Sequence, residues 1–166
     1  LEDMAQITEM LTERKYNGSM EKVGKAILKH SDYAGNDVIR FFELTLFCFI
    51  TGNADMHLKN FSLLKNLDKE ITLSPAYDLL SSKILMPEDK EELGLTLNGK
   101  KNNLRKKDFD LFAEKLGVTQ KTNDVIINKF FSSQQILNKT IDASFLKVDT
   151  KILYKELIEL RLGRLK

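Results

Sequence analysis

The sequence has few of the residues that build crosslinks and metal clusters: its 166 residues include one cysteine and two histidines. One cysteine cannot form a disulfide within the chain. Cys48 lies inside an apolar run, where a thiol usually serves as a small buried hydrophobic group. A four-ligand zinc site would have to rely on carboxylates, which structural zinc sites seldom do. The composition therefore fits a reducing compartment and argues against a fold held together by disulfides or by structural zinc.

Long apolar runs, targeting signals and a strong net charge are also missing. The longest apolar segment is interrupted by Arg40 and Glu43 and is too short to cross a bilayer. No signal-peptide pattern is present. The formal net charge of +2 provides no field that would attract nucleic acid or an anionic membrane. We expect a cytoplasmic protein without membrane or direct nucleic-acid contacts, and the start at Leu1 is typical of a fragment.

The third absence is a glycine-rich nucleotide loop. No two glycines stand in a Gly-x-Gly arrangement, and Gly24-Lys25 falls inside a predicted helix, so this is not a P-loop. Any site for a phosphate-containing ligand must therefore be built from other residues.

Helical patterns dominate what is present, and we predict a single, mainly α domain over residues 1–166 with a few short strands. Ser19 is a suitable N-cap for a helix that ends near His30. Residues 37–50 are apolar almost all round, which predicts a buried central helix, although a buried strand is the alternative for its second half. Further helices are expected at residues 3–13, 106–116, 120–141 and 150–165. A β-hairpin is expected at 61–65 and 70–74, and a strand at 93–97 before an Asn98-Gly99 turn.

The polar loop that follows the central helix carries the most informative motif. Gly52 ends the helix, and the sequence Asn53-Ala-Asp-Met-His-Leu-Lys-Asn60 follows. Asp55 and Asn60 are five residues apart, which is the interval between the base and a metal ligand in kinase catalytic loops. A second carboxylate, Asp78, follows the predicted hairpin, where kinases place the other metal-binding Asp.

Each residue of this set also has an ordinary structural interpretation. Asp and Asn are common in loops, His57 alone is more often a packed residue than a ligand, and Asp78 could cap a helix at 79–82. The order of the elements favours phosphoryl transfer: a buried helix, a break, the polar loop, a hairpin and Pro-Ala-Tyr-Asp78. A carboxylate beside the acceptor hydroxyl and an Asn–Asp pair around Mg²⁺ meet the main needs of that reaction.

These two segments, residues 53–62 and 73–81, resemble the HipA-like serine/threonine kinases of bacterial toxin–antitoxin systems. The segments Arg14-Lys15-Tyr16, 95–102 and 141–146 add to the likeness, which covers the whole chain as the helical C-terminal lobe of such a kinase. The resemblance implies ATP and Mg²⁺ as cofactors, Asp55 as general base, Asn60 and Asp78 as metal ligands, and a nucleotide bordered by His57, Lys59 and Tyr77. It also implies short hairpins that carry the metal site, a protein substrate such as an aminoacyl-tRNA synthetase, and a DNA-binding HipB-like antitoxin.

The sequence departs from that family in coverage. The glycine-rich cover, the strand lysine and the adenine hinge of a kinase are not found in these residues, so we expect the N-terminal lobe to be absent and the isolated chain to be inactive. Two alternatives stay open: a non-catalytic protein-binding module derived from a kinase lobe, and a phosphoinositide-kinase-like enzyme. The second is disfavoured because Leu79-Leu80, rather than Phe-Gly or Leu-Gly, follows Asp78.

The basic run over residues 100–107 permits a nucleic-acid interpretation. No aromatic residue interrupts its five cations, and the run extends across a turn and a helix start. A solvated turn is the better interpretation.

Overall fold

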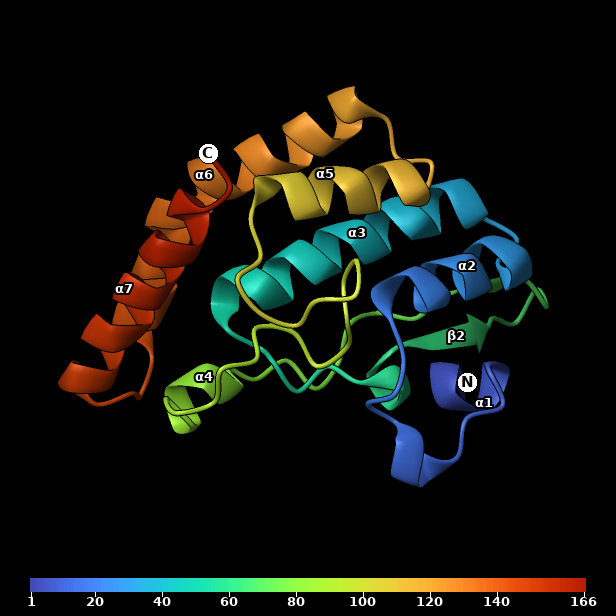
Figure 1. Cartoon of the computed structure of the whole chain (residues 1–166), viewed down its shortest axis with the longest axis horizontal. Coiled ribbons are helices and arrows are strands. Elements are labelled where there is room, and N and C mark those ends of the chain that lie inside the picture. The colour runs from blue at the N-terminus through green and yellow to red at the C-terminus, as the bar shows by residue number, and fades with distance from the viewer.

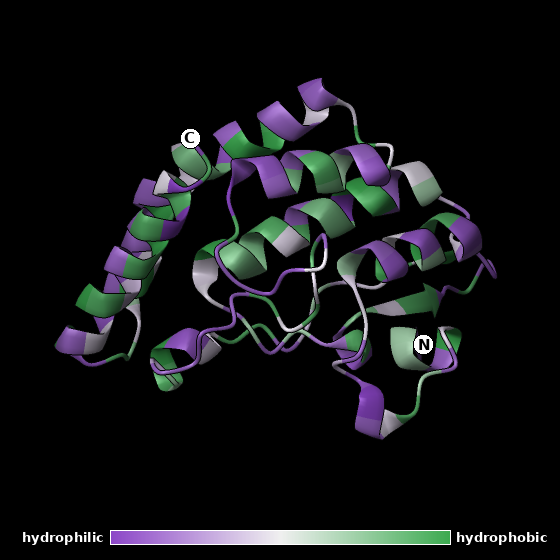
Figure 2. Cartoon of the chain, in the orientation of Figure 1, coloured by the Kyte–Doolittle hydropathy of each residue, from purple (hydrophilic) through white to green (hydrophobic).

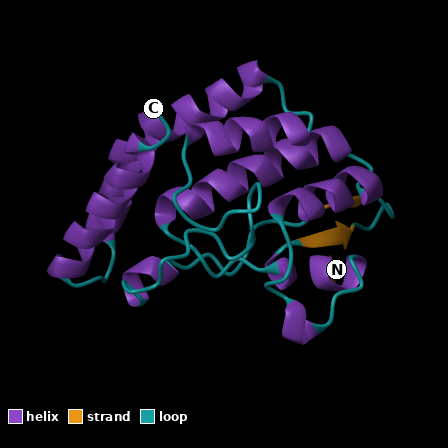
Figure 3. Ribbon diagram, viewed as in Figure 1, coloured by secondary structure: helices purple, strands orange, loops and turns teal.

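The computed structural model describes all residues, 1–166, as a helical body with a small sheet at one side (Figures 1 and 3). The principal helices are α2 (Met20–His30), α3 (Ala34–Thr51), α5 (Lys106–Lys115), α6 (Gln120–Ala143) and α7 (Val148–Gly163). Shorter helical pieces are α1 (Met4–Ile7), η1 (Thr12–Arg14), η2 (Leu58–Asn60) and α4 (Ser82–Leu85). The antiparallel sheet has the order β1 (Glu2–Asp3), β2 (Ser62–Lys65) and β3 (Ile71–Leu73). The predicted mainly helical fold with short strands is confirmed.

Helix α3 forms the centre of the molecule, as its composition predicts. It lies between α2 and α5 and is apolar along most of its length (Figures 1 and 2). Phe41, Phe42, Leu46 and Phe49 are fully buried within one core cluster of 34 residues. The strand alternative for its second half is excluded. None of the helices combines the length and the apolar composition that a membrane crossing requires.

Two helix boundaries follow directly from local chemistry. The Ser19 side chain accepts a hydrogen bond from the backbone N–H of Lys22 at the start of α2, as an N-cap does. Gly52 ends α3 in the left-handed conformation, with φ at 73°, which glycine adopts without a Cβ penalty. Both predictions are confirmed. Cys48 is fully buried, and burial raises the pKa of its thiol to about 12, so the interpretation of Cys48 as a buried apolar group also holds.

Two predicted elements are wrong. Residues 3–13 do not form one helix, because Glu2 and Asp3 pair with β2 and Glu9 adopts a positive φ of 52° that ends the first turn. Residues 93–97 do not form a strand of a sheet. They make only isolated bridges, Ser19 with Thr96 and Leu97 with Lys100, although the Asn98-Gly99 turn is present with positive φ at both residues.

The chain from Leu93 to Leu97 runs through the core instead, where Leu93, Leu95 and Leu97 are fully buried. The apolar alternation predicted a strand, but these side chains belong to the main core cluster rather than to one face of a sheet. The basic run beside this segment is largely neutralised. Lys100 pairs with Asp108, Lys101 with Glu91 and Lys106 with Asp110, at 2.7, 3.1 and 2.9 Å.

A buried ion pair fixes α7 to the loop that follows α4. The Arg161 guanidinium lies 3.1 Å from Glu92 Oε1 and 4.7 Å from the centre of the Phe49 ring, and both charged side chains are buried. The same carboxylate accepts a hydrogen bond from Arg164 and, through Oε2, from the backbone N–H of Leu104 at 2.9 Å. Burial lowers the pKa of Arg161 to about 10, which reflects the cost of keeping this cation from water.

We therefore predict that Glu92→Gln destabilises the protein by about 3 kcal/mol, because it leaves the buried Arg161 charge without an opposite charge. The matched control is Glu91→Gln. Glu91 pairs with Lys101 near the surface, where such a pair contributes about 0–1 kcal/mol. Urea unfolding at pH 7 measures both changes. Equal effects of the two substitutions would contradict the assignment of the buried pair as the structural contact.

Candidate functional site

The polar loop begins where the central helix ends, and two backbone hydrogen bonds hold its first residues. Asn53 is 2% exposed and bonds its backbone N–H to Cys48 O at 2.8 Å. The backbone N–H of Ala54 donates to Ser82 Oγ at 2.8 Å, at the start of α4. The loop is therefore attached to a rigid buried helix on one side and to α4 on the other, an arrangement that fixes side chains accurately.

Asn53 also joins the two segments that carry the predicted carboxylates. Its Oδ1 accepts the backbone N–H of Asp55 at 3.2 Å, and its Nδ2 donates to the backbone carbonyl of Asp78 at 3.3 Å. One buried amide thus holds both backbones. Burial raises the pKa of the Tyr16 phenol to about 12, and the hydrogen bond and charge of Asp55 add to this rise. The charges of Glu91 and Asp78 raise the same pKa further, so Asp55 and Asp78 both act on Tyr16.

Asn60 and Asp78 lie in direct contact. Asn60 Nδ2 donates to Asp78 Oδ2, and Asn60 Oδ1 accepts the backbone N–H of His57 at 3.2 Å. Asn60 is buried, whereas Asp78 is exposed and has a positive φ of 55°. Helix α4 begins at Ser82 and its N-cap residue is Ser81, so Asp78 does not cap a helix at 79–82.

His57, Lys59 and Tyr77 are placed differently from one another. The ring of His57 is 7% exposed and its Nδ1 has no hydrogen-bond partner, and burial together with the charge of Lys15 lowers its pKa. The Lys59 side chain is exposed and makes no hydrogen bond or ion pair. The Tyr77 hydroxyl donates to Lys59 O at 2.7 Å and contacts Ser62 Oγ at 2.5 Å, which ties the end of the loop to the segment that precedes Asp78. The assignment of these three residues to a nucleotide stays a prediction.

Three residues that contribute to the site were not identified as such from the sequence. In the sequence Asn53 is one residue of the motif, Tyr16 is one residue of an upstream segment, and Gly94 belongs to no motif. The contact of Gly94 with the loop is tight: a Cβ built there would lie 2.7 Å from Met56 O and 2.9 Å from Ala54 O. No local pattern signals this role, because the loop and Gly94 are 34 or more residues apart in the sequence.

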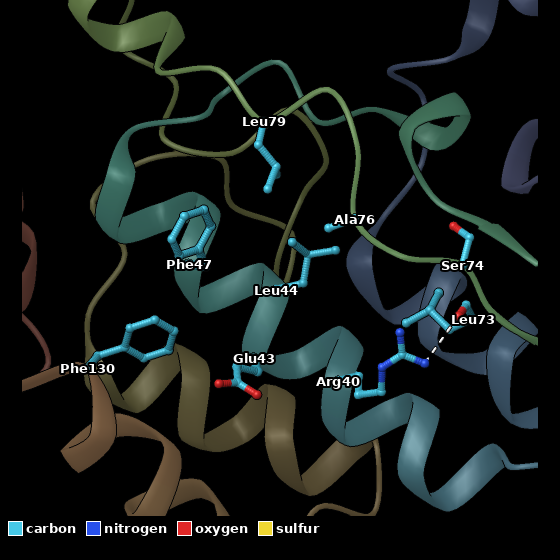
Figure 4. A pocket seen from close by; sticks show the side chains of 9 residues that line it. All are labelled: Arg40, Glu43, Leu44, Phe47, Leu73, Ser74, Ala76, Leu79 and Phe130. Atoms are coloured by element: carbon cyan, nitrogen blue, oxygen red, sulfur yellow. Dashed lines mark hydrogen bonds between the residues drawn. The ribbon is translucent and has the colours of Figure 1, made fainter. Parts of the chain in front are cut away.

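A separate apolar pocket of about 340 Å³ lies between α3, α6 and the segment from β3 to Leu79 (Figure 4). Its charged side chains are already paired: Arg40 with Asp37 at 2.9 Å and with Leu73 O at 3.1 Å, and Glu43 with Lys129. No unpaired titratable group faces this pocket.

Comparison with known proteins agrees with the likeness noted in the sequence. Residues 1–136 match the family described as the HipA-like C-terminal domain. A Sinorhizobium fredii protein named "Putative kinase Y4dM" is 33% identical over 123 residues, which cover 73% of this chain and 30% of that protein. A Haemophilus influenzae protein named "Putative kinase" is 32% identical over 63 residues, which cover 38% of this chain and 18% of the relative. The chain thus spans less than a third of the length of these relatives.

A solved structure shares the fold. HipA of Shewanella oneidensis MR-1, from a toxin–antitoxin complex with HipB and its operator DNA, superimposes with a TM-score of 0.79 and 18% identity. The match covers 98% of this chain and 43% of HipA. The arrangement of helices and loop described above is therefore a HipA-like fold.

The contact at Gly94 gives a testable prediction for the loop. Gly94→Ala should destabilise the protein by about 1–3 kcal/mol, because the new methyl group meets two backbone carbonyls that cannot rotate away. The amide NMR signals of residues 54–60 should shift more than those of the distant α6. Gly35→Ala is the control, since a Cβ there meets nothing within 4 Å. If Gly94→Ala leaves the loop signals and the stability unchanged, the loop is not held as described.

Proposed function

The chain belongs to the HipA-like C-terminal domain family, and on that basis we propose that it is the catalytic lobe of a serine/threonine protein kinase. The observation that carries the proposal is the direct contact of Asn60 with Asp78 on segments that Asn53 joins to Asp55. The reaction is transfer of the ATP γ-phosphate to a protein hydroxyl. Relatives named as kinases support this reaction class.

Asp55 is the proposed general base. It lies at the edge of a pocket, partly exposed, so an acceptor hydroxyl can reach its carboxylate. The carboxylate would take the hydroxyl proton as the acceptor oxygen forms its bond to the γ-phosphorus and the bond to the leaving ADP breaks. Phosphoryl transfer depends chiefly on such positioning and on charge neutralisation.

Asn60 and Asp78 fit a magnesium ion in number and in chemistry. Mg²⁺ prefers oxygen ligands and keeps several waters and phosphate oxygens, so two protein ligands suffice. A carboxamide oxygen has two lone pairs, so Asn60 Oδ1 can keep its bond to His57 N and still face a cation. The chain has no cluster of three or more His, Cys, Asp or Glu side chains suited to a metal, so the proposed site would rest on Asn60 and Asp78 alone. When bound, the cation would neutralise the phosphate charge.

The remaining loop residues would line the nucleotide. Lys59 is an unpaired exposed cation close to the proposed metal ligands and is suited to contact phosphate oxygens. The buried, unpartnered Nδ1 of His57 can receive a hydrogen bond from a group that enters the site. Tyr77 supports the loop through Lys59 O and would border the nucleotide from that position.

We further propose that a second lobe supplies the glycine-rich phosphate cover and the adenine contacts, because these 166 residues contain neither. The relatives extend well beyond the matched region and leave room for such a lobe. By analogy with the HipA–HipB complex, the protein would be the toxin of a toxin–antitoxin pair with a HipB-like, DNA-binding antitoxin. An aminoacyl-tRNA synthetase is a candidate substrate by the same resemblance.

The strongest alternative is a protein-binding module without catalysis. The contact between Asn60 and Asp78 speaks against it, since binding alone does not require a buried amide to meet an exposed carboxylate at this position. A phosphoinositide-kinase-like activity has no structural observation in its favour.

The test is γ-phosphate transfer from ³²P-labelled ATP in a protein that carries both lobes. Asp55→Asn should lower kcat by about 10²–10⁴-fold, the usual contribution of a general base. Asp78→Asn should raise the Mg²⁺ concentration needed for half-maximal rate, because one of two protein ligands loses its charge.

Asp68→Asn is the matched control. Asp68 lies exposed in the β2–β3 turn and makes no hydrogen bond, so its substitution should leave the rate unchanged. Full activity of both Asp55→Asn and Asp78→Asn would refute the kinase assignment.

A further inference from the structure

The hydroxyl of Tyr16 occupies one oxygen of the proposed base. It donates to Asp55 Oδ1 at 2.5 Å, and its ring meets the His57 ring edge-on, with centroids 5.0 Å apart. The other oxygen, Oδ2, has no hydrogen-bond partner. Tyr16 and Asp55 both line a pocket of about 380 Å³ whose other walls include Ser82, Met86, Glu91 and Lys101.

The chain around Tyr16 is fixed to the loop on both sides of the tyrosine. Lys15 O accepts the backbone N–H of Leu58 at 3.1 Å, and Gly18 packs so closely on Leu58 that a Cβ would lie 3.0 Å from its side chain. The Gly18 carbonyl also accepts the Thr96 hydroxyl at 3.2 Å. The Tyr16 side chain itself is 38% exposed, so it can leave Asp55 while the backbone stays in place.

The phenol has the chemistry of an acceptor. An acceptor hydroxyl in a kinase is neutral, donates its proton to the catalytic carboxylate and lies within hydrogen-bond distance of it. Tyr16 meets each of these conditions. Its pKa of about 12, raised by burial and then by Asp55, keeps it a neutral donor at physiological pH.

From this arrangement we infer that the pocket is the binding site for the hydroxyl of the phosphate acceptor, and that Tyr16 occupies it until the acceptor displaces the phenol. The inference rests on the proposed kinase function and extends it by locating the acceptor and a contact that closes its site. A hydroxyl-bearing side chain, or a water molecule, would take the place of the phenol on Asp55.

A purely supporting role for Tyr16 agrees less well with the contacts. The backbone of Asp55 is already held by Asn53 Oδ1 at 3.2 Å, and that of the preceding Ala54 by Ser82 Oγ at 2.8 Å. What the phenol adds is occupation of one carboxylate oxygen, Asp55 Oδ1, in a pocket that both residues line. Its removal should therefore open the site rather than disorder it.

The first experiment tests the contact in the 166-residue chain, without reference to activity. The chain has four tyrosines and no tryptophan, so ¹³Cζ-tyrosine NMR resolves each phenol during a pH titration. Tyr16→Phe assigns the Tyr16 signal. Asp55→Asn should lower the pKa of Tyr16 from about 12 toward its ordinary value and leave Tyr33 unchanged. A Tyr16 signal that is insensitive to Asp55→Asn overturns the inference.

The second experiment measures phosphate release from Mg-ATP in the protein that carries both lobes, with water as the acceptor. Tyr16→Phe should raise the rate by about tenfold, the factor expected when one competing hydrogen bond to a charged group is lost. The gain should vanish in the Asp55→Asn background. Tyr33→Phe is the matched control, because the Tyr33 hydroxyl also donates to a carboxylate, that of Glu70 at 2.5 Å, away from the site.

The outcomes separate the two proposals. A lower or unchanged rate in Tyr16→Phe, with activity otherwise intact, overturns the occupied-acceptor inference and leaves the kinase function standing. Absence of both phosphate release and γ-phosphate transfer to protein from every variant, the parent included, removes the kinase function and the acceptor role with it, even where NMR finds the contact.

Discussion

The site depends on the buried side chain of Asn53. This amide sits at the end of the central helix and bonds to the backbone of Asp55 on one side and of Asp78 on the other. The two carboxylate-bearing segments are 23 residues apart in sequence. The Asn53 amide is the contact that bonds to the backbones of both carboxylate residues, and the contacts of Asn60 with Asp78 and of Tyr77 with Lys59 O support it. Because its polar atoms are buried and both are bonded, any displacement of either segment would leave an unsatisfied group, which is costly in a protein interior. The buried Asn53 side chain thus fixes the backbone of Asp55 relative to that of Asp78.

The core in turn is arranged to support this connection. Most residues of helix α3 from Asp37 to Thr51 are buried, and the helix ends at Gly52, so the loop starts from a fixed point. At the other end of α3, Asp37 accepts the backbone N–H of Leu73 at 2.6 Å and holds the strand that leads to Asp78. Gly94 and Ser82 contact the loop from two further segments. Four parts of the chain therefore contact the loop of residues 53–60: the end of α3, the segment at Asp78, Ser82 and Gly94. So many contacts agree with a loop that positions chemical groups and does more than connect two elements.

Much of the helical framework could be predicted from sequence, because its signals are local. Ser19, Gly52 and the Asn98-Gly99 turn act through their own backbone conformations, and the composition of residues 37–50 shows that they are buried. Residues 3–13 and 93–97 were misassigned because long-range contacts decide their structure: pairing with β2 in one case, packing in the core in the other. Likewise Asp55, Asn60 and Asp78 stand in a recognisable order, whereas the roles of Asn53, Tyr16 and Gly94 arise from contacts between distant segments that no spacing reveals.

The central claim is that Asn60 and Asp78 share one divalent cation beside Asp55. Paramagnetic Mn²⁺, which takes the same oxygen ligands as Mg²⁺, tests it in the 166-residue chain by NMR. The account predicts that low Mn²⁺ concentrations broaden the amide signals of residues 55–60 and 77–80 first, and that Asp78→Asn abolishes this selective broadening. Broadening that begins elsewhere, for example at the acidic residues 88–92, and leaves the signals of Asn60 and Asp78 sharp would contradict it.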